Sequence, residues 1–137
     1  MAAGTARERT RLIHLDTSLL VDALTGPKRS APALRRVIAG GERVAMSALV
    51  LYEWLRGPRM PEELAFQEAL LPAEAAVPTG PDDAARAAAL YRALRRPRGR
   101  EIDLLIAACA LAHGAALWTL DPRDFDDVPD LVLLRPE

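Results

Sequence analysis

The stretch Leu12–Leu24, "LIHLDTSLLVDAL", joins a short apolar run to a helical pattern through a single aspartate. Residues 12–15 are few and apolar, which predicts a buried strand. The residues that follow predict a helix whose cap is Asp16, Thr17 or Ser18. A carboxylate buried at such a junction is costly without a partner. Asp16 is therefore either a helix cap or one wall of a charged pocket.

The same alternation of short apolar runs and helical patterns continues along the chain. Further strands are predicted at 43–46, 74–78, 115–120 and 131–134, and helices at 33–41, 48–57, 61–71, 81–96 and 101–114. Short strands that alternate with helices predict an α/β fold with a central parallel sheet of about five strands, covered by helices on both faces. In such folds ligands bind beyond the carboxyl ends of the strands.

Composition limits the classes of protein that this chain can belong to. With 137 residues, of which 50% are hydrophobic and 27% charged, we expect one globular domain over 12–137 after a flexible N-terminal tail over 1–11. The net charge of −1 gives no general attraction for nucleic acid. The single cysteine, Cys109, cannot form an internal disulfide and lies in an apolar run. No apolar run reaches the roughly 18 residues of a membrane span, so we expect a cytoplasmic location.

Four carboxylates are predicted to meet at the ligand edge of the sheet. Asp16 and Asp121 each follow an apolar strand, and Asp103 lies in the first turn of the most apolar helix. Glu53 lies on the inward face of its helix, three residues after Val50. Taken singly, the aspartates could be helix caps or first-turn acids that the helix dipole favours. Glu53 has no capping role of this kind.

Four carboxylates at one edge repel one another unless a cation lies among them. Mg²⁺ and Mn²⁺ prefer such oxygen ligands, and they activate water and polarise phosphates. The sequence offers no His and Cys cluster for zinc. His14 and His113 are isolated in apolar surroundings and are interpreted as structural.

Three segments carry a resemblance to a known family. The segments "HLDTSLLVDAL" (14–24), "MSALVLYEWLRG" (46–57) and "EIDLLIAACALAHGAALWTLDPRDF" (101–125) resemble successive motifs of the PIN domain, and of the VapC toxins of bacterial VapBC toxin–antitoxin pairs in particular. The resemblance extends over about Leu12–Leu134. It implies a three-layer α/β/α sandwich and a Mg²⁺- or Mn²⁺-dependent endoribonuclease that dimerises and is silenced by a VapB-like antitoxin.

The resemblance also implies roles for individual residues. The acids expected to hold the metal and to carry catalysis are Asp16, Glu53, Asp103 and Asp121. Supporting roles, in orienting the carboxylates or a water, fall on Thr17, Ser18, Thr119 and Asp124.

Two further features concern partners. The segment "RALRRPRGR" (92–100) offers arginines for RNA phosphates, namely Arg95, Arg96, Arg98 and Arg100. Basic residues at a helix C-terminus and in a solvated loop are the structural alternative. The amphipathic helices at 33–41 and 61–71 could form a dimer surface, a groove for an antitoxin helix, or simply core-facing helices.

Two other functions compete with the metal-dependent nuclease. A catalytically silent PIN-like module could bind RNA or a protein partner without cutting, although the complete set of acids argues against it. A phosphotransfer enzyme could use Asp16 as nucleophile, but such enzymes need a second aspartate two residues on, where this chain has Ser18.

Overall fold

The computed structural model describes residues 11–135, so residues 1–10 of the predicted N-terminal tail lie outside it. Arg11, the last residue assigned to that tail, pairs with Glu42 at 3.0 Å. The strands are β1 (Leu12–Leu15), β2 (Arg43–Ala45) and β3 (Ala116–Trp118). The helices are α2 (Thr17–Leu24), α3 (Ala31–Ala39), α4 (Ala48–Arg56), α5 (Pro61–Leu70), α6 (Pro81–Ala93) and α7 (Glu101–Ala112). Two 3₁₀ turns complete the list, η1 (Ala73–Ala75) and η2 (Pro122–Asp124).

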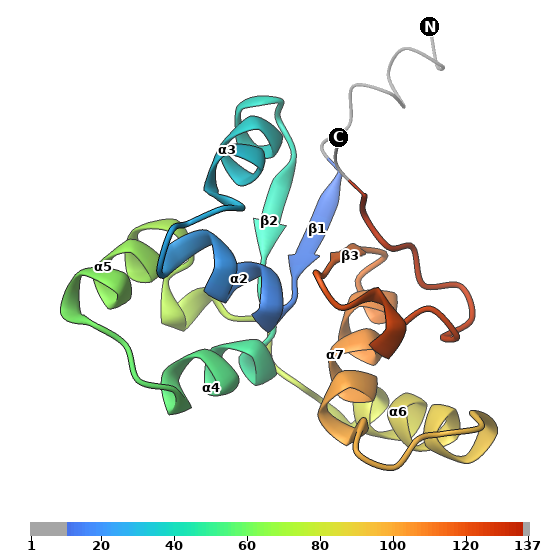
Figure 1. Cartoon of the computed structure of the whole chain (residues 1–137). Helices are drawn as coiled ribbons and strands as arrows, with labels where there is room; N and C mark the ends of the chain where they lie inside the picture. The colour runs from blue at the N-terminus through green and yellow to red at the C-terminus, as the bar shows by residue number, and fades with distance from the viewer. Residues whose placement is uncertain (1–10, 136–137) are drawn as a thin grey trace, which may run out of the picture.

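The sheet is parallel and has β1 at its centre, in the order β2-β1-β3. Ile13 of β1 pairs with Val44 on one side and with Ala116 on the other. Figure 1 shows α2, α3, α4 and α5 gathered on one side of the sheet and α6 and α7 on the other. The prediction of a parallel α/β sheet with helices on both faces is therefore confirmed.

The prediction of about five strands is wrong, because the described residues contain three. The predicted strand at 74–78 begins in the turn η1, and only Val77 forms a parallel bridge, to Ser47. Pro78 follows directly and has no N–H to extend the pairing. The segment 131–134 likewise forms one bridge, Leu117 to Leu133. Both segments lie beside the sheet where edge strands would be, but each is too short to count as a strand.

The core lies between the sheet and the helices around it. Ile13 and Leu15 of β1 are fully buried, as are Val50 and Trp54 of α4. The start of α4 is fixed by Ser47, whose Oγ accepts a hydrogen bond from the backbone N–H of Val50 at 3.2 Å. This hydrogen bond caps the N-terminus of α4, the helix on which Glu53 lies.

Cys109 is a free, fully buried thiol within the apolar helix α7. Among residues 11–135, no helix is long and apolar enough to cross a membrane.

Candidate active site

Asp16 lies at the carboxyl end of β1, where its carboxylate meets hydroxyl groups from two elements. The side chain is 5% exposed. Its Oδ2 accepts hydrogen bonds from Thr119 Oγ1 at 2.7 Å and from Ser18 Oγ at 3.0 Å. The backbone N–H of Asp16 donates to the carbonyl of Trp118 at 2.9 Å, which holds the ends of β1 and β3 side by side.

This geometry decides between the two roles expected for Asp16. The residue occupies the N-cap position of α2, but its side chain makes no capping hydrogen bond to the helix. The carboxylate is instead held by the hydroxyls of Ser18 and Thr119. Burial raises the pKa of Asp16, with a smaller contribution from the charge of Glu53, whereas the two hydroxyls act in the opposite direction. The side chain of Asp16 is therefore not a helix cap; its carboxylate is buried between two hydroxyls, and the charge of Glu53 acts on it.

Glu53 lies on α4, close enough to Asp16 for its charge to raise the pKa of Asp16. Its Oε1 accepts a hydrogen bond from Thr17 Oγ1 at 2.6 Å, which ties α4 to the first residue of α2. Its Oε2 lies 3.6 Å from Arg56, one turn further along the helix. Glu53 is half-buried, and both of its carboxylate oxygens therefore have a partner within the chain.

Asp103 lies in the first turn of α7, and the charges of other acids raise its pKa. Burial and then the charges of Asp124, Asp16 and Glu53 raise its pKa to about 7, against a partial opposing effect of Arg100. A carboxylate whose pKa is raised by like charges lies where positive charge is lacking. The charges of Asp124, Asp16 and Glu53 thus act on Asp103, and these four acids are called the acid cluster below.

Asp121, which precedes the turn η2, and Asp124, which ends it, differ in their relation to the acid cluster. Asp124 is half-buried, and among the neighbouring charges it raises the pKa of Asp103 most. Asp121 is exposed, and its backbone N–H donates to Thr119 Oγ1 at 2.9 Å. Asp121 is one of the four acids that the sequence offered as metal ligands, and that role stays a prediction. Strand and helix periodicity do not define which residue of a turn faces inward, so the sequence could not rank Asp124 against Asp121.

The acid cluster offers the oxygen ligands that a hard divalent cation prefers, but the distances between its side chains are larger than in a formed metal site. All four acids of the cluster offer oxygen atoms, which Mg²⁺ and Mn²⁺ prefer. However, within the described part of the chain no three His, Cys, Asp or Glu side chains lie close enough together to hold a metal ion as they stand. Burial and like charges both raise the pKa of Asp103, and the part due to like charges is what a bound cation would offset.

An arginine-lined cavity of about 1030 Å³ borders the cluster at Asp124. Its walls include the predicted arginines of 95–100 and also Arg123, which the sequence analysis did not single out. The only signal for Arg123 was its place between two acids of the turn, a pattern that is common on solvated loops. Arg100 lines the same cavity, but its guanidinium pairs with Asp127.

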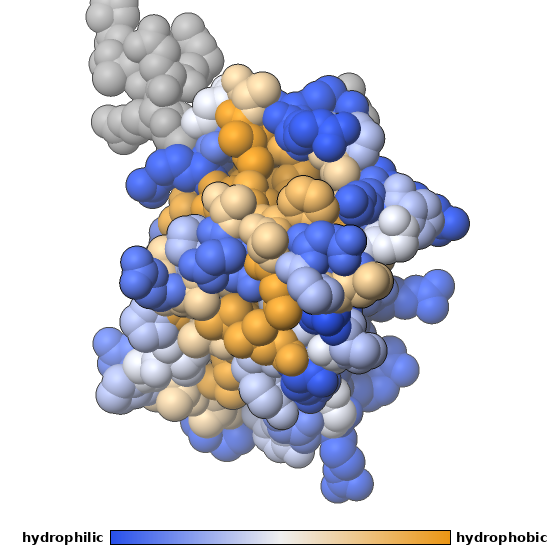
Figure 2. All heavy atoms as spheres, turned by 90° about the vertical axis from the view of Figure 1, so that its left-hand side faces the viewer, coloured by the Kyte–Doolittle hydropathy of each residue, from blue (hydrophilic) through white to orange (hydrophobic). Residues whose placement is uncertain are grey.

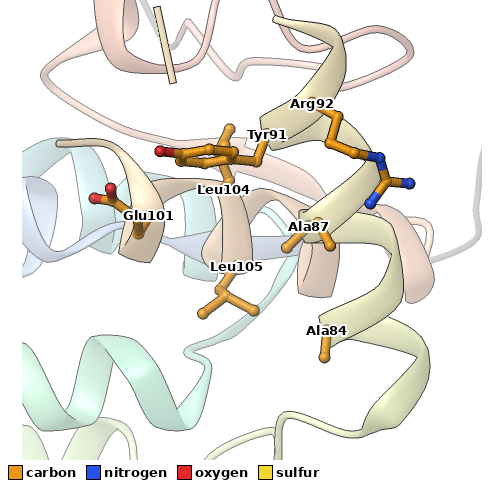
Figure 3. A pocket seen from close by; sticks show the side chains of 8 residues that line it. Ala84, Ala87, Tyr91, Arg92, Glu101, Leu104 and Leu105 are labelled. Atoms are coloured by element: carbon orange, nitrogen blue, oxygen red, sulfur yellow. The ribbon is translucent and has the colours of Figure 1, made fainter. Parts of the chain in front are cut away.

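A second cavity, of about 390 Å³, lies between α6 and α7 and is mostly apolar. Figure 3 shows the ring of Tyr91 over Leu104, with Ala84 and Ala87 of α6 along one wall and Leu105 below. Leu104 and Leu105 lie about 100° and 200° around α7 from Asp103, and none of the acids Asp16, Glu53, Asp103 and Asp124 lines this groove. This groove is therefore separate from the acid cluster.

Large apolar side chains are exposed on the side of the molecule formed by α3, α4 and α5. Figure 2 shows them as a band bordered by charged residues. The exposed residues of this apolar band are Ile38, Tyr52, Leu55, Met60, Leu64 and Phe66. The helices predicted at 33–41 and 61–71 thus present apolar side chains to solvent as well as to the core.

Comparison with known proteins gives a consistent result. The family model described as PIN domain matches residues 13–131. Ribonuclease VapC19 of Mycobacterium tuberculosis is 38% identical over 120 residues, which cover 85% of this chain and 94% of that protein. Two solved structures share the fold. A complex of VapBC2 from Rickettsia felis with promoter DNA matches with a TM-score of 0.75 and 24% identity, over 92% of this chain and 99% of that one. VapBC-5 of Mycobacterium tuberculosis, a member of the VapBC toxin–antitoxin family, matches with a TM-score of 0.61 and 25% identity, over 90% and 98%.

Proposed function

Because the chain belongs to the PIN-domain family, we propose that it is a Mg²⁺- or Mn²⁺-dependent endoribonuclease that acts as the toxin of a type II toxin–antitoxin pair. The ribonuclease relative at 38% identity supports the activity. The observation in this chain that carries the proposal is the grouping of Asp124, Asp16 and Glu53 near Asp103: burial, and then repulsion from these three charges, raises the pKa of Asp103 to about 7. A divalent cation at this site would relieve that repulsion.

In the proposed mechanism, Asp16, Glu53, Asp103 and Asp124 hold the cation, with Asp121 as a further ligand candidate at the rim. When bound, Mg²⁺ or Mn²⁺ supplies a water of lowered pKa and an electrophile for the phosphate oxygens. Hydroxyl groups of the chain hold two of these carboxylates in position. Ser18 and Thr119 donate to Asp16 and favour its ionised form, while Thr17 fixes Glu53. No side-chain nucleophile is needed.

RNA is proposed to approach through the arginine-lined cavity. Arg95, Arg96 and Arg98 are largely exposed at its wall, as is Arg123. Arginine binds phosphate oxygens with paired donors, and phosphate contacts supply most of the affinity for nucleic acid. Asp124 lies at the same cavity, so a strand held there would pass the acid cluster.

A VapB-like antitoxin is the proposed protein partner, and the apolar band is its proposed seat. The likeness to VapBC-5, a toxin–antitoxin system, supports the partner, and an apolar band with a charged border suits an amphipathic helix. We expect Leu55→Glu and Phe66→Glu to abolish binding of a co-expressed antitoxin while RNA cleavage persists. Unchanged binding would place the partner elsewhere.

A homodimer and a cytoplasmic location complete the proposal. Light scattering of the pure protein should give twice the mass of one chain, and a mass of 14.9 kDa would contradict the dimer.

The decisive assay measures cleavage of tRNA, ribosomal RNA and a generic single strand by the pure protein. We would compare Mn²⁺ with a chelator, and wild type with Asp103→Asn. The matched control is Asp130→Asn, because Asp130 is exposed and asparagine accepts its φ of +68°. We expect discrete fragments that require metal, persist in the control and vanish in Asp103→Asn. Cleavage by both variants alike would contradict the proposal.

The second candidate is a catalytically silent PIN-like module that binds RNA or a protein. The observation that favours it is the lack of three closely grouped ligands within residues 11–135. In the same assay it predicts RNA binding without metal-dependent fragments. A phosphoaspartate trapped at Asp16 would instead support phosphotransfer.

A further inference from the structure

Arg100 differs from its neighbouring arginines in that its guanidinium is bound within the chain. Its side chain is 15% exposed. Nη1 and Nη2 contact the two carboxylate oxygens of Asp127 at 3.0 and 2.5 Å. Nη2 also donates to the backbone carbonyl of Asp124 at 2.9 Å, and Nη1 to that of Arg96 at 3.2 Å.

These contacts join two segments that carry acids of the cluster. Arg100 is the N-cap residue of α7, and its carbonyl accepts the helix hydrogen bond from Leu104 at 2.8 Å, one residue after Asp103. Asp124 ends the turn η2, which is only three residues long. So short a turn has little rigidity of its own, and the guanidinium binds it directly at the Asp124 carbonyl.

We propose that Arg100 is a positioning residue that clamps the segment 122–127 to the start of α7 and so sets the spacing between the carboxylates of Asp124 and Asp103. This inference rests on the proposed function, because the spacing matters only if both acids serve a metal. It adds a role for a residue that the sequence analysis grouped with the RNA-binding arginines.

The electrostatics agree with a clamp. The hydrogen bond from Arg100 lowers the pKa of Asp127, and the pair with Asp127 raises the pKa of Arg100, so both groups are held in their charged forms. The charges of Asp103 and Asp124 also act on Arg100. Four of the five guanidinium donors are engaged, and the fifth, on Nε, is buried without a partner among the described residues, so little capacity is left for a phosphate.

The shape of the guanidinium makes this role specific to arginine. A planar fork grips Asp127 with two parallel donors and still reaches the Asp124 carbonyl, whereas a lysine ammonium is a point charge without this geometry. Arg100→Lys therefore keeps the charge but loses the clamp, and Asp127→Asn loses it from the other partner.

The first measurement is Mn²⁺ binding, followed by electron paramagnetic resonance of the free ion, in wild type, Arg100→Lys and Asp127→Asn. Loss of an outer contact to a metal ligand weakens metal affinity by about 10- to 100-fold. We expect both variants to fall in that range. Arg92→Lys, an exposed arginine at the end of α6 that lines the apolar groove, is the matched control and should bind Mn²⁺ as wild type does.

RNA cleavage kinetics separate a clamp from a phosphate contact. A clamp predicts that both variants lower kcat at a fixed Mn²⁺ concentration and leave KM for RNA nearly unchanged. If Arg100 held RNA, Arg100→Lys would raise KM, and Asp127→Asn would lower KM because the guanidinium would be released. That pattern would overturn the proposal.

Hydrogen exchange gives a readout that does not depend on function. The N–H groups of Asp124, Phe125 and Val128 form the backbone hydrogen bonds of the clamped segment. We expect faster exchange there in both variants, with exchange in β1 unchanged. If wild type binds no Mn²⁺ but exchange follows this pattern, the clamp stands and the proposed function fails. Unchanged exchange, or variants that do not fold at all, would contradict the clamp.

Discussion

The hydroxyl of Thr119, which directly follows β3, connects the ends of β1 and β3 at the acid cluster. It donates to Asp16 at 2.7 Å and accepts from the N–H of Asp121 at 2.9 Å, so one side chain fixes both a carboxylate and the start of the turn η2. Outer-shell partners of this kind orient metal ligands and raise their affinity.

Thr119→Val should therefore weaken Mn²⁺ binding and lower RNA cleavage by about 10- to 100-fold. Valine has the shape of threonine but neither donates to Asp16 nor accepts from Asp121. Thr119→Ser, which keeps the hydroxyl, is the control and should retain most of the activity. Equal losses in both variants would mean that packing of the methyl group matters instead of the hydrogen bonds.

The raised pKa of Asp103 predicts how stability depends on pH when metal is absent. The folded-state pKa is about 7 and the ordinary value is 3.8, so between these values the folded state binds the proton more strongly. The contribution of Asp103 to stability therefore grows as the pH falls from 7 to about 4. With a chelator present, Asp103→Asn should melt at a higher temperature than wild type at pH 8, and this gain should vanish near pH 4. A gain that does not depend on pH would contradict the assignment.

His14 should act on stability in the opposite direction. The residue is 1% exposed, and neither ring nitrogen has a partner among the described residues. Burial, with the charge of His113, lowers its pKa from 6.5 to about 4. Protonation of His14 thus costs stability as the pH falls through this range, up to about 3 kcal/mol.

We therefore expect His14→Leu, made in the Asp103→Asn background, to remove the loss of stability between pH 6.5 and 4. Urea unfolding at several pH values measures it. His113→Ala, which alters an exposed ring, is the control and should keep most of the dependence. A profile that is unchanged in His14→Leu would show that other groups cause it.

At the scale of elements, the pattern of apolar residues predicted the order of the strands and helices along the chain. Leu12–Leu15 could be predicted as a strand because its apolar run is short and ends at a helix start. Helix α7 could be predicted as buried because apolar residues cover nearly all of its faces. The predicted edge strands at 74–78 and 131–134 each form only a single bridge. At 74–78 the turn η1 and Pro78 interrupt the pairing, which an apolar pattern does not reveal.

The same contrast holds for the candidate site. Asp16, Glu53 and Asp103 could be placed from the sequence because each has a defined position on a strand end or helix face. Asp124 and Asp121 lie in a turn without periodicity, so their relative importance required the structure. Arg100 could not be separated from Arg98 by sequence, because the partner Asp127 is 27 residues away and meets it only in the fold.

Helices α4 and α5 are joined by a buried polar contact that should affect stability without affecting the site. Trp54 Nε1 donates to Gln67 Oε1 at 3.2 Å, and Gln67 Nε2 donates to the carbonyl of Leu71 at 2.9 Å. Gln67→Leu leaves both partners buried without a hydrogen bond and should cost about 2 kcal/mol in unfolding by urea. Mn²⁺ affinity should not change. Glu62→Gln, exposed on the same helix, is the control.

At the scale of the whole molecule, a net charge of −1 conceals a strong local separation of charge. Arginines gather at one cavity and the acids lie beside it, where Asp124 belongs to both. A summed charge cannot show this arrangement. From the sequence we could predict only a basic segment before Asp103.

Arg95→Gln combined with Arg98→Gln should raise KM for RNA with little effect on kcat. Because each phosphate contact of a single strand adds about 0.7 to the salt dependence of binding, the slope of log affinity against log salt should fall by about 1.4. Fluorescence anisotropy with labelled RNA measures this. Arg86→Gln, exposed on α6, is the control. An unchanged slope would move the RNA path away from this cavity.

The central claim is that the carboxylates of four different segments form one divalent-cation site. Its most direct test is a titration of the pure protein with Mn²⁺, in wild type and in Asp16→Asn, Glu53→Gln, Asp103→Asn and Asp124→Asn. We predict a saturable site in wild type that is weakened in every variant, most strongly in Asp16→Asn and Asp103→Asn. Wild type without saturable binding, or variants that bind as wild type does, would contradict the claim.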